Sequence, residues 1–225
     1  PLRAVFPYRL MWRLLMRDSD SYIAALLHEG FHTYQGTVAP ERLAAAENVN
    51  RLEPQYPWDD AALAKGWQHE VGFLARAVRA ASNTEAADLA GQFLAARAAR
   101  RAAAGLDADL VDFERQREWL EGLAKYAEVS VGRVAVHTAG YSPLPKVTAD
   151  PAFRSYADSE TYYTSQLGEI TRTAGRSGDS RFYYTGMAQA VLLDRLLPGW
   201  QAQAFSSAVM LEDLLQEAVA PRATP

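Results

Sequence analysis

The chain has 225 residues, of which 49% are hydrophobic and 22% are charged, a length and composition typical of a globular protein with a substantial core in one domain. A net charge of −4 argues against a nucleic-acid groove, and no apolar tract is long enough to span a membrane. The absence of cysteine excludes disulfides, thiolate nucleophiles and cysteine-ligated zinc. We expect residues 1–225 to form a single domain with a trimmed N-terminus, because the first residue is Pro1, and localisation stays unassigned.

Hydrophobic periodicity and helix-capping residues predict a mainly helical fold. The apolar stretch from Leu2 to Leu15 can hold a short strand, and a helix is expected from about Asp20 to Gln35. Residues 37–58 are rich in proline, asparagine and polar groups, which favours a loop with one short helix around Glu41 to Val49. Proline and glycine in residues 138–181 predict a long irregular connection over a cleft. The remaining helices are expected at about residues 59–79, 83–104, 107–131, 183–197 and 206–219.

The pentapeptide His28-Glu29-Gly30-Phe31-His32 matches the HExxH pattern. On a helix, residues four apart lie nearly one above the other, so His28 and His32 can offer imidazole nitrogens to one zinc ion. Glu29 is poorly placed as a further ligand but well placed to accept a proton from a metal-activated water. The alternative is that the two histidines are hydrogen-bonded on the polar face of an ordinary helix.

The helix that carries this motif has two distinct faces. We expect it to bury its apolar face and to present His28 and His32, together with Gln35, toward a cleft. The apolar face comprises Ile23, Leu26, Leu27, Gly30, Phe31 and Tyr34.

The helix expected at 107–131 carries a stripe of charge at helical spacing, formed by Glu114, Glu118, Glu121, Lys125 and Glu128. Because a two-histidine site needs a carboxylate, we expect this stripe to supply the third ligand. The alternative is a solvated charged face, which is also our interpretation of the arginine-rich stretch 97–101.

Two glycines support the same pairing of helices. Gly30 follows Glu29 and Gly122 follows Glu121, and glycine costs about 1 kcal/mol relative to alanine inside a helix. A close approach of the two backbones, which would let Glu121 reach the metal, explains both positions. The alternative is that both glycines are simply tolerated.

The segments LLHEGFHTYQ and WLEGLAKYAE together resemble the gluzincin metallopeptidases, the HExxH-plus-glutamate class that includes thermolysin and the zinc aminopeptidases. The resemblance implies a helical metallopeptidase-like domain in which the motif helix packs against a second ligand helix. It also implies Zn²⁺ held by His28, His32 and Glu121, with Glu29 as general base. It covers under a fifth of the chain; residues 33–120 make a longer separation than in the best-known members, and no exopeptidase motif is present.

Supporting roles are distributed over several candidates. Gluzincins generally use a tyrosine or histidine to donate to the developing oxyanion, and we assign this role to Tyr184, with Tyr183 and His137 as alternatives and aromatic packing as the competing interpretation. Glu118 is the alternative third ligand. The carboxylates expected to accept a hydrogen bond from a metal-bound imidazole are Glu118, Glu128 or Glu114. Residues His69 and His137 are otherwise interpreted as surface or structural histidines.

The sequence therefore favours a zinc-dependent hydrolase that acts on a peptide or protein, with no nucleic-acid partner and no membrane span. A non-catalytic helical binding or scaffold domain that keeps a structural or vestigial metal site is the alternative. A ferritin-like di-metal protein is disfavoured because it needs two Glu-x-x-His pairs, and only Glu29 and His32 have that spacing.

Overall fold

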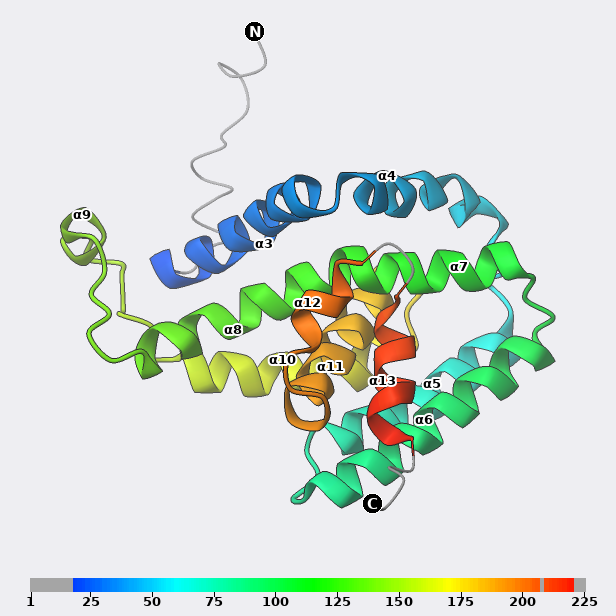
Figure 1. Cartoon of the computed structure of the whole chain (residues 1–225). Helices are drawn as coiled ribbons and strands as arrows, with labels where there is room; N and C mark the ends of the chain where they lie inside the picture. The colour runs from blue at the N-terminus through cyan, green and yellow to red at the C-terminus, as the bar shows by residue number, and fades with distance from the viewer. Residues whose placement is uncertain (1–17, 207–208, 221–225) are drawn as a thin grey trace, which may run out of the picture.

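The computed structural model describes residues 18–206 and 209–220, and within these ranges the chain is helical with no strand (Figure 1). The mainly helical fold class is thus confirmed, while the strand considered between Leu2 and Leu15 lies outside the described residues. No helix of the described part is long and apolar enough to cross a membrane. The elements are α3 (Ser19–Val38), α4 (Pro40–Asn48), the 3-10 helix η1 (Val49–Gln55), α5 (Ala61–Ala77), α6 (Asn83–Ala103), α7 (Ala108–Arg117), the π-helix η2 (Glu118–Gly122), α8 (Leu123–His137), α9 (Pro145–Thr148), α10 (Ser159–Thr173), α11 (Ser180–Leu196), α12 (Trp200–Ala204) and α13 (Leu211–Val219).

One long rod, formed by α7, η2 and α8 without a break, organises the fold (Figure 1). The rod begins at Asp107, whose side chain accepts a hydrogen bond from the backbone N–H of Leu110. Helices α3 and α4 lie along one side of the rod, and the α5–α6 hairpin lies on the other. The expected helix at 107–131 is therefore present, and it continues to His137.

Helix α11 is the central element of the core. Every residue from Thr185 to Leu193 is buried, as expected for a helix surrounded by others on all sides. It packs against η2, α8, α10 and α13. Because α11 crosses η2, it can place side chains close to those of α3, the helix that carries the HExxH motif.

The crossing of α11 and η2 is a backbone contact between two glycines. A Cβ added to Gly122 would lie 2.4 Å from the Cα of Gly186, and a Cβ added to Gly186 would lie 2.3 Å from the carbonyl oxygen of Glu118. The expectation that Gly30 and Gly122 bring α3 and the ligand helix together is wrong. Gly122 does permit a close approach, but to α11, and nothing lies within 4 Å of a Cβ built on Gly30.

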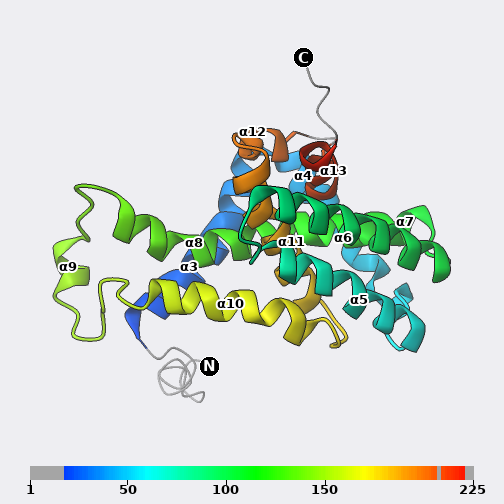
Figure 2. The same cartoon turned by 90° about the horizontal axis from the view of Figure 1, so that it is seen from below.

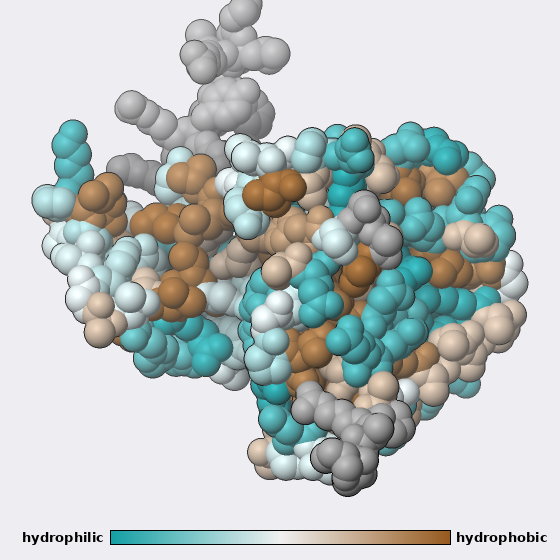
Figure 3. Space-filling model, in the orientation of Figure 1, coloured by the Kyte–Doolittle hydropathy of each residue, from teal (hydrophilic) through white to brown (hydrophobic). Residues whose placement is uncertain are grey.

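The orientation of α3 also differs from the expectation. Its histidine face points inward and its apolar face points outward, so that Leu26 is 58% and Tyr34 50% exposed while Gln35 is fully buried. The physical reason is that His28 and the Gln35 amide nitrogen find hydrogen-bonding partners on α8 and η2, and buried polar groups require such partners. The outward face appears as brown surface over α3 in Figure 3.

Residues 138–181 are more regular than expected, because α10 occupies Ser159–Thr173 and the short α9 precedes it. Tyr163, Leu167, Ile170 and Ala174 follow helical spacing and pack against or within the core. Threonine, serine and glycine between them weaken the apolar periodicity, so the sequence does not predict this helix. The short helix expected around Glu41 to Val49 is present as α4.

Candidate metal centre

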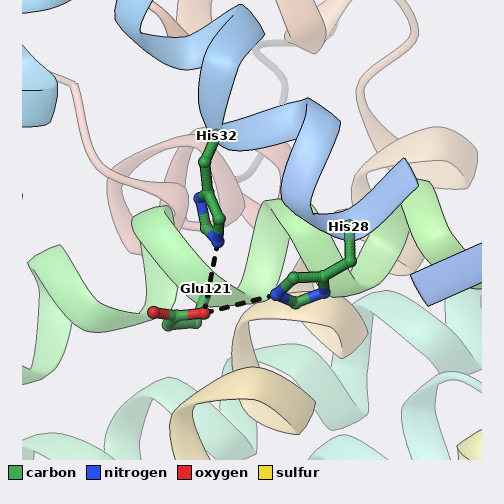
Figure 4. A group of neighbouring side chains, drawn as sticks. All are labelled: His28, His32 and Glu121. Atoms are coloured by element: carbon green, nitrogen blue, oxygen red, sulfur yellow. Dashed lines mark ion pairs between the residues drawn. The ribbon is translucent and has the colours of Figure 1, made fainter. Parts of the chain in front are cut away.

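Helix α3 places the two motif histidines one turn apart above the rod (Figure 4). The helix begins at Asp18, whose side chain accepts a hydrogen bond from the backbone N–H of Ser21. The rings of His28 and His32 have centroids 5.1 Å apart and are nearly perpendicular, at 82°. Both imidazoles point down from α3 toward the same carboxylate on η2, that of Glu121.

The three residues that the sequence predicts as ligands are brought together. Oε2 of Glu121 lies 3.4 Å from Nε2 of His28 and 3.6 Å from Nε2 of His32. One ligand atom from each residue falls within 4.8 Å of the others. Oε2 is buried and makes no hydrogen bond with the described residues, although it faces both imidazole nitrogens. An unsatisfied buried carboxylate oxygen at the convergence of two imidazoles is the arrangement expected of a metal-ligand set.

The π-turn of η2 determines which carboxylate faces the histidines. A π-turn closes i→i+5 hydrogen bonds, so it takes more residues than an α-turn and shifts the face on which later side chains emerge. In a regular α-helix Glu118 and Glu121 would share one face. Here Glu121 faces α3, whereas Glu118 faces the interior and is bound by Arg97 at 2.6 and 2.8 Å. Glu118 as the alternative third ligand is therefore ruled out by its orientation.

Glu118 and Glu114 belong to a buried ion-pair network. Arg100 and Arg101 donate to Glu114, and Glu118 also accepts from the side chains of Thr185 and Gln189. The arginine stretch 97–101 was interpreted as a solvated face, but Arg97 is fully buried because α6 packs it against these carboxylates. Of the expected charge stripe, Glu114 and Glu118 thus belong to this ion-pair network, whereas Glu121 and Glu128 lie at the histidine site.

Each histidine has a second partner on its Nδ1 atom. Nδ1 of His32 lies 2.8 Å from Oε1 of Gln35, and Nδ1 of His28 lies 3.2 Å from Oε2 of Glu128. The Gln35 amide is oriented by the donation of its Nε2 to the carbonyl oxygens of Trp119 and Leu120 on η2. Both acceptors favour a proton on Nδ1, so each imidazole, when neutral, keeps its lone pair on Nε2.

Of the three carboxylates proposed to support a histidine, the structure selects Glu128. Its other oxygen accepts hydrogen bonds from Lys125, at 2.6 Å, and from the hydroxyl of Tyr162. Gln35 was placed on the correct face by the sequence but was given no role. Its amide is complementary to both His32 and η2, so it joins the two helices that carry the ligands.

The second oxygen of Glu121 is held by an arginine. Nη2 of Arg117 donates to Oε1 of Glu121 at 3.2 Å and also to Asp179, while its Nη1 donates to Asn50 at 3.0 Å. Arg117 therefore connects α7 with η1 and with the start of α11. Because Arg117 binds Oε1 of Glu121, the other oxygen, Oε2, is the one that faces the histidines.

The pKa values of His28 and Glu121 are shifted because the imidazoles and carboxylates lie close together. Burial of His28 acts to lower its pKa, but the neighbouring carboxylates of Glu121 and Glu128 outweigh it and raise the pKa to about 9. Burial acts to raise the pKa of Glu121, but the adjacent His28, His32 and Tyr183 side chains hold that pKa well below its usual range. In the metal-free protein the cluster holds protons where a cation would otherwise sit, so metal binding must release them.

Glu29 follows His28 on α3 and is exposed. Its carboxylate makes no hydrogen bond and no ion pair with the described residues. Its role as general base stays a prediction.

Among the tyrosines that the structure describes, Tyr183 packs directly against a motif histidine. Its ring stacks on His28 with centroids 5.5 Å apart and 8° between the planes, and its hydroxyl contacts the Glu121 carboxylate. The hydroxyl of Tyr184, the first choice from the sequence, donates instead to Oε1 of Gln166 at 3.1 Å. Adjacent helical residues point about 100° apart, and the sequence does not reveal which one faces the site.

The two histidines outside the motif lie away from this centre. His137, at the end of α8, is exposed and 3.4 Å from Glu160. His69 is exposed on α5 and packs its ring against Phe73. His137, an alternative oxyanion donor, is thus placed elsewhere.

Comparison of the chain with models of protein families, with curated proteins and with solved structures found no match.

Proposed function

We propose that this protein is a zinc-dependent hydrolase that cleaves peptide bonds. The observation that carries the proposal is the spacing of the three ligand atoms. Ligands about 2.1 Å from a common tetrahedral centre lie about 3.4 Å from one another. Oε2 of Glu121 lies 3.4 Å from Nε2 of His28 and 3.6 Å from Nε2 of His32. The set therefore needs little movement to accept an ion.

The chemistry of the donors supports zinc as that ion. Two neutral imidazoles and one carboxylate are a common catalytic zinc set, and three protein ligands leave a fourth position open for water. A structural zinc site usually has four protein ligands. Of the described residues, only His28, His32 and Glu121 form such a group of at least three possible ligands. An open fourth position favours catalysis over a structural role.

The chain's own residues have defined parts in the reaction. When bound, zinc supplies Lewis acidity and lowers the pKa of its water to about 7. Glu29 accepts a proton from the attacking water and delivers it to the nitrogen of the leaving amine. The hydroxyl of Tyr183 donates to the substrate carbonyl oxygen as negative charge develops on it.

Supporting residues keep these groups in place. Glu128 and Gln35 hold the imidazoles through Nδ1, and Arg117 holds the Glu121 carboxylate through Oε1. Such partners fix the orientation and the tautomer of the ligands, so the centre is organised before substrate binds.

The test measures metal content and activity together. Protein purified without chelator is expected to contain about one zinc per chain, and the His32→Ala variant much less. Glu29→Gln is expected to keep the zinc but to lose hydrolysis of a peptide panel by at least about a hundredfold. Glu47→Gln, an exposed glutamate on α4, is the matched control and should retain activity. Absence of zinc, or full activity of Glu29→Gln, contradicts the proposal; zinc without any cleavage favours a scaffold role.

A further inference from the structure

A pocket of about 540 Å³ lies beside the candidate metal centre, where the first half of α3 meets α8 and the start of α10 (Figure 2). Its walls are mostly apolar, and no residue of the proposed catalytic set lines it. The apolar and aromatic lining residues are Ala24, Val129, Val131, Gly132, Tyr156 and Tyr162.

The pocket shares one wall with the histidine site. Glu128 lines it and accepts the hydrogen bond from Nδ1 of His28, and Tyr162 lines it and donates to Glu128. Ala24 lies one turn before His28, a rise of about 6 Å along α3. An extended peptide advances about 3.3 Å per residue. A side chain in the pocket would therefore belong to a residue within about two positions of a bond held at the metal centre.

The charged residues that line the pocket are all acidic. Four lining residues are acidic, namely Asp18, Asp20, Asp158 and Glu128, and no lysine, arginine or histidine is among the described lining residues. Lys125 neutralises Glu128, and Arg154 pairs with Asp158 at 3.2 Å in a solvent-exposed contact, which stabilises little.

The remaining two carboxylates bind backbone N–H groups rather than cations. Asp18 accepts from Ser21, and Asp20 accepts from Arg154 and Tyr156. These bonds fix the carboxylates at the pocket without cancelling their charge. In the described part of the chain the pocket therefore keeps a net negative charge above apolar walls.

We propose that this pocket binds the lysine or arginine side chain of a peptide substrate. The aliphatic stem would pack against Val129, Val131 and Tyr162, and the cationic end would meet Asp20 and Asp158. A purely apolar side chain would fit the walls but would leave the carboxylates without a counter-charge. The inference rests on the proposed peptidase function for the class of substrate, but the pocket itself can be tested without catalysis.

The first experiment measures binding to the Glu29→Gln protein by NMR, with n-pentylamine as a mimic of the lysine side chain and 1-pentanol as its uncharged analogue. We expect the amine to shift the backbone resonances of Gly132 and Thr161, which lie at the pocket, at several-fold lower concentration than the alcohol. Equal effects of the two compounds, or shifts confined to other regions, would overturn the proposal. Hydrolysis plays no part in this readout.

The second experiment compares peptides that differ only in lysine against norleucine at positions near the scissile bond. Asp158→Asn should lower kcat/KM for the lysine peptide by about fivefold more than for the norleucine peptide, because only the charged end meets this carboxylate. The side chain of Asp158 makes no capping hydrogen bond, so the change spares α10. Asp88→Asn, an exposed residue on α6, is the control.

The two proposals fail in different ways. Zinc-dependent cleavage with no preference for lysine or arginine would refute the pocket assignment and leave the peptidase intact. Amine binding to the pocket without cleavage of any peptide would refute the peptidase and leave a cation-binding pocket.

Discussion

Gln35 accepts a hydrogen bond from Nδ1 of His32 at 2.8 Å and, through its amide nitrogen, donates to the carbonyl oxygens of Trp119 and Leu120. One fully buried side chain thus orients a predicted ligand and binds the π-turn that presents another. The two ligand helices are coupled at this residue.

Gln35→Met keeps the size of the side chain but removes all three hydrogen bonds. We expect zinc affinity to fall about 10- to 100-fold, the effect usual for the loss of a residue that supports a metal ligand. Titration with a competing chelator measures this directly. Gln92→Met, at an exposed position of α6, controls for the chemistry of the substitution. Unchanged zinc affinity in Gln35→Met would contradict the role assigned to Gln35.

Tyr183 and Tyr184 form a matched pair for testing the oxyanion donor. Tyr183→Phe removes the hydroxyl that contacts Glu121 but keeps the ring stacked on His28, so we expect kcat to fall about a hundredfold with zinc retained. Tyr184→Phe removes only the hydrogen bond to Gln166 and should change kcat by less than about threefold. The reverse ranking in steady-state kinetics would restore the sequence-based choice of Tyr184.

The contact between Gly122 and Gly186 predicts a large effect of a small substitution. An alanine at Gly186 would bring its Cβ to 2.3 Å from a backbone oxygen of η2, so the two helices must separate. We expect Gly186→Ala to lower the free energy of unfolding by about 3 kcal/mol and to weaken zinc binding. Gly30→Ala meets nothing within 4 Å and should stabilise by up to about 1 kcal/mol. Denaturant unfolding of both variants, with chelator present, measures the difference.

Stability should depend on pH differently with and without metal. The folded-state pKa of His28 is about 9, above its ordinary value of 6.5. Its contribution to the metal-free protein is therefore fully present below about pH 6.5 and is lost as the pH rises through 9. Zinc competes with the same protons, so the stabilisation by zinc should grow over that range.

Thermal unfolding at pH 6, 7.5 and 9, with EDTA or with added zinc, separates the two trends. The His28→Gln variant should lose both of them. A metal-free protein whose melting temperature rises steadily from pH 6.5 to 9 would show that the His28 cluster does not hold the proton.

The sequence was informative where the types of residue and the spacing between them point to the same chemistry. Two histidines four apart on a helix were sufficient to select His28 and His32, whereas Glu121 was singled out from its stripe of glutamates by the resemblance of WLEGLAKYAE to the gluzincins; the structure brings the three residues together. Metal binding is the usual reason for two imidazoles and a carboxylate to occur in an HExxH-plus-glutamate pattern. The helical class was likewise predictable from caps and periodicity, as at Asp107 and Asp18.

Tertiary packing decided the features that were missed. The π-turn separates Glu118 from Glu121; it lies where η2 crosses α11 and has no clear mark in the sequence. The inward orientation of the polar face of α3 contradicts the rule that apolar faces are buried, because His28 and the amide nitrogen of Gln35 have partners on the rod. The local sequence of a helix does not show which distant residues will bind its polar side chains.

Helix α3 is held against the rod by its polar side, while much of its apolar side faces out. Its attachment therefore draws less on solvent exclusion than that of most surface helices, and more on protons or a cation shared among three side chains. Amide hydrogen exchange along α3 should consequently act as a gauge of occupancy, slowing when the centre is filled while the exchange of α11 stays the same. Helix α3 would then be a local folding unit whose opening is controlled by its own ligand.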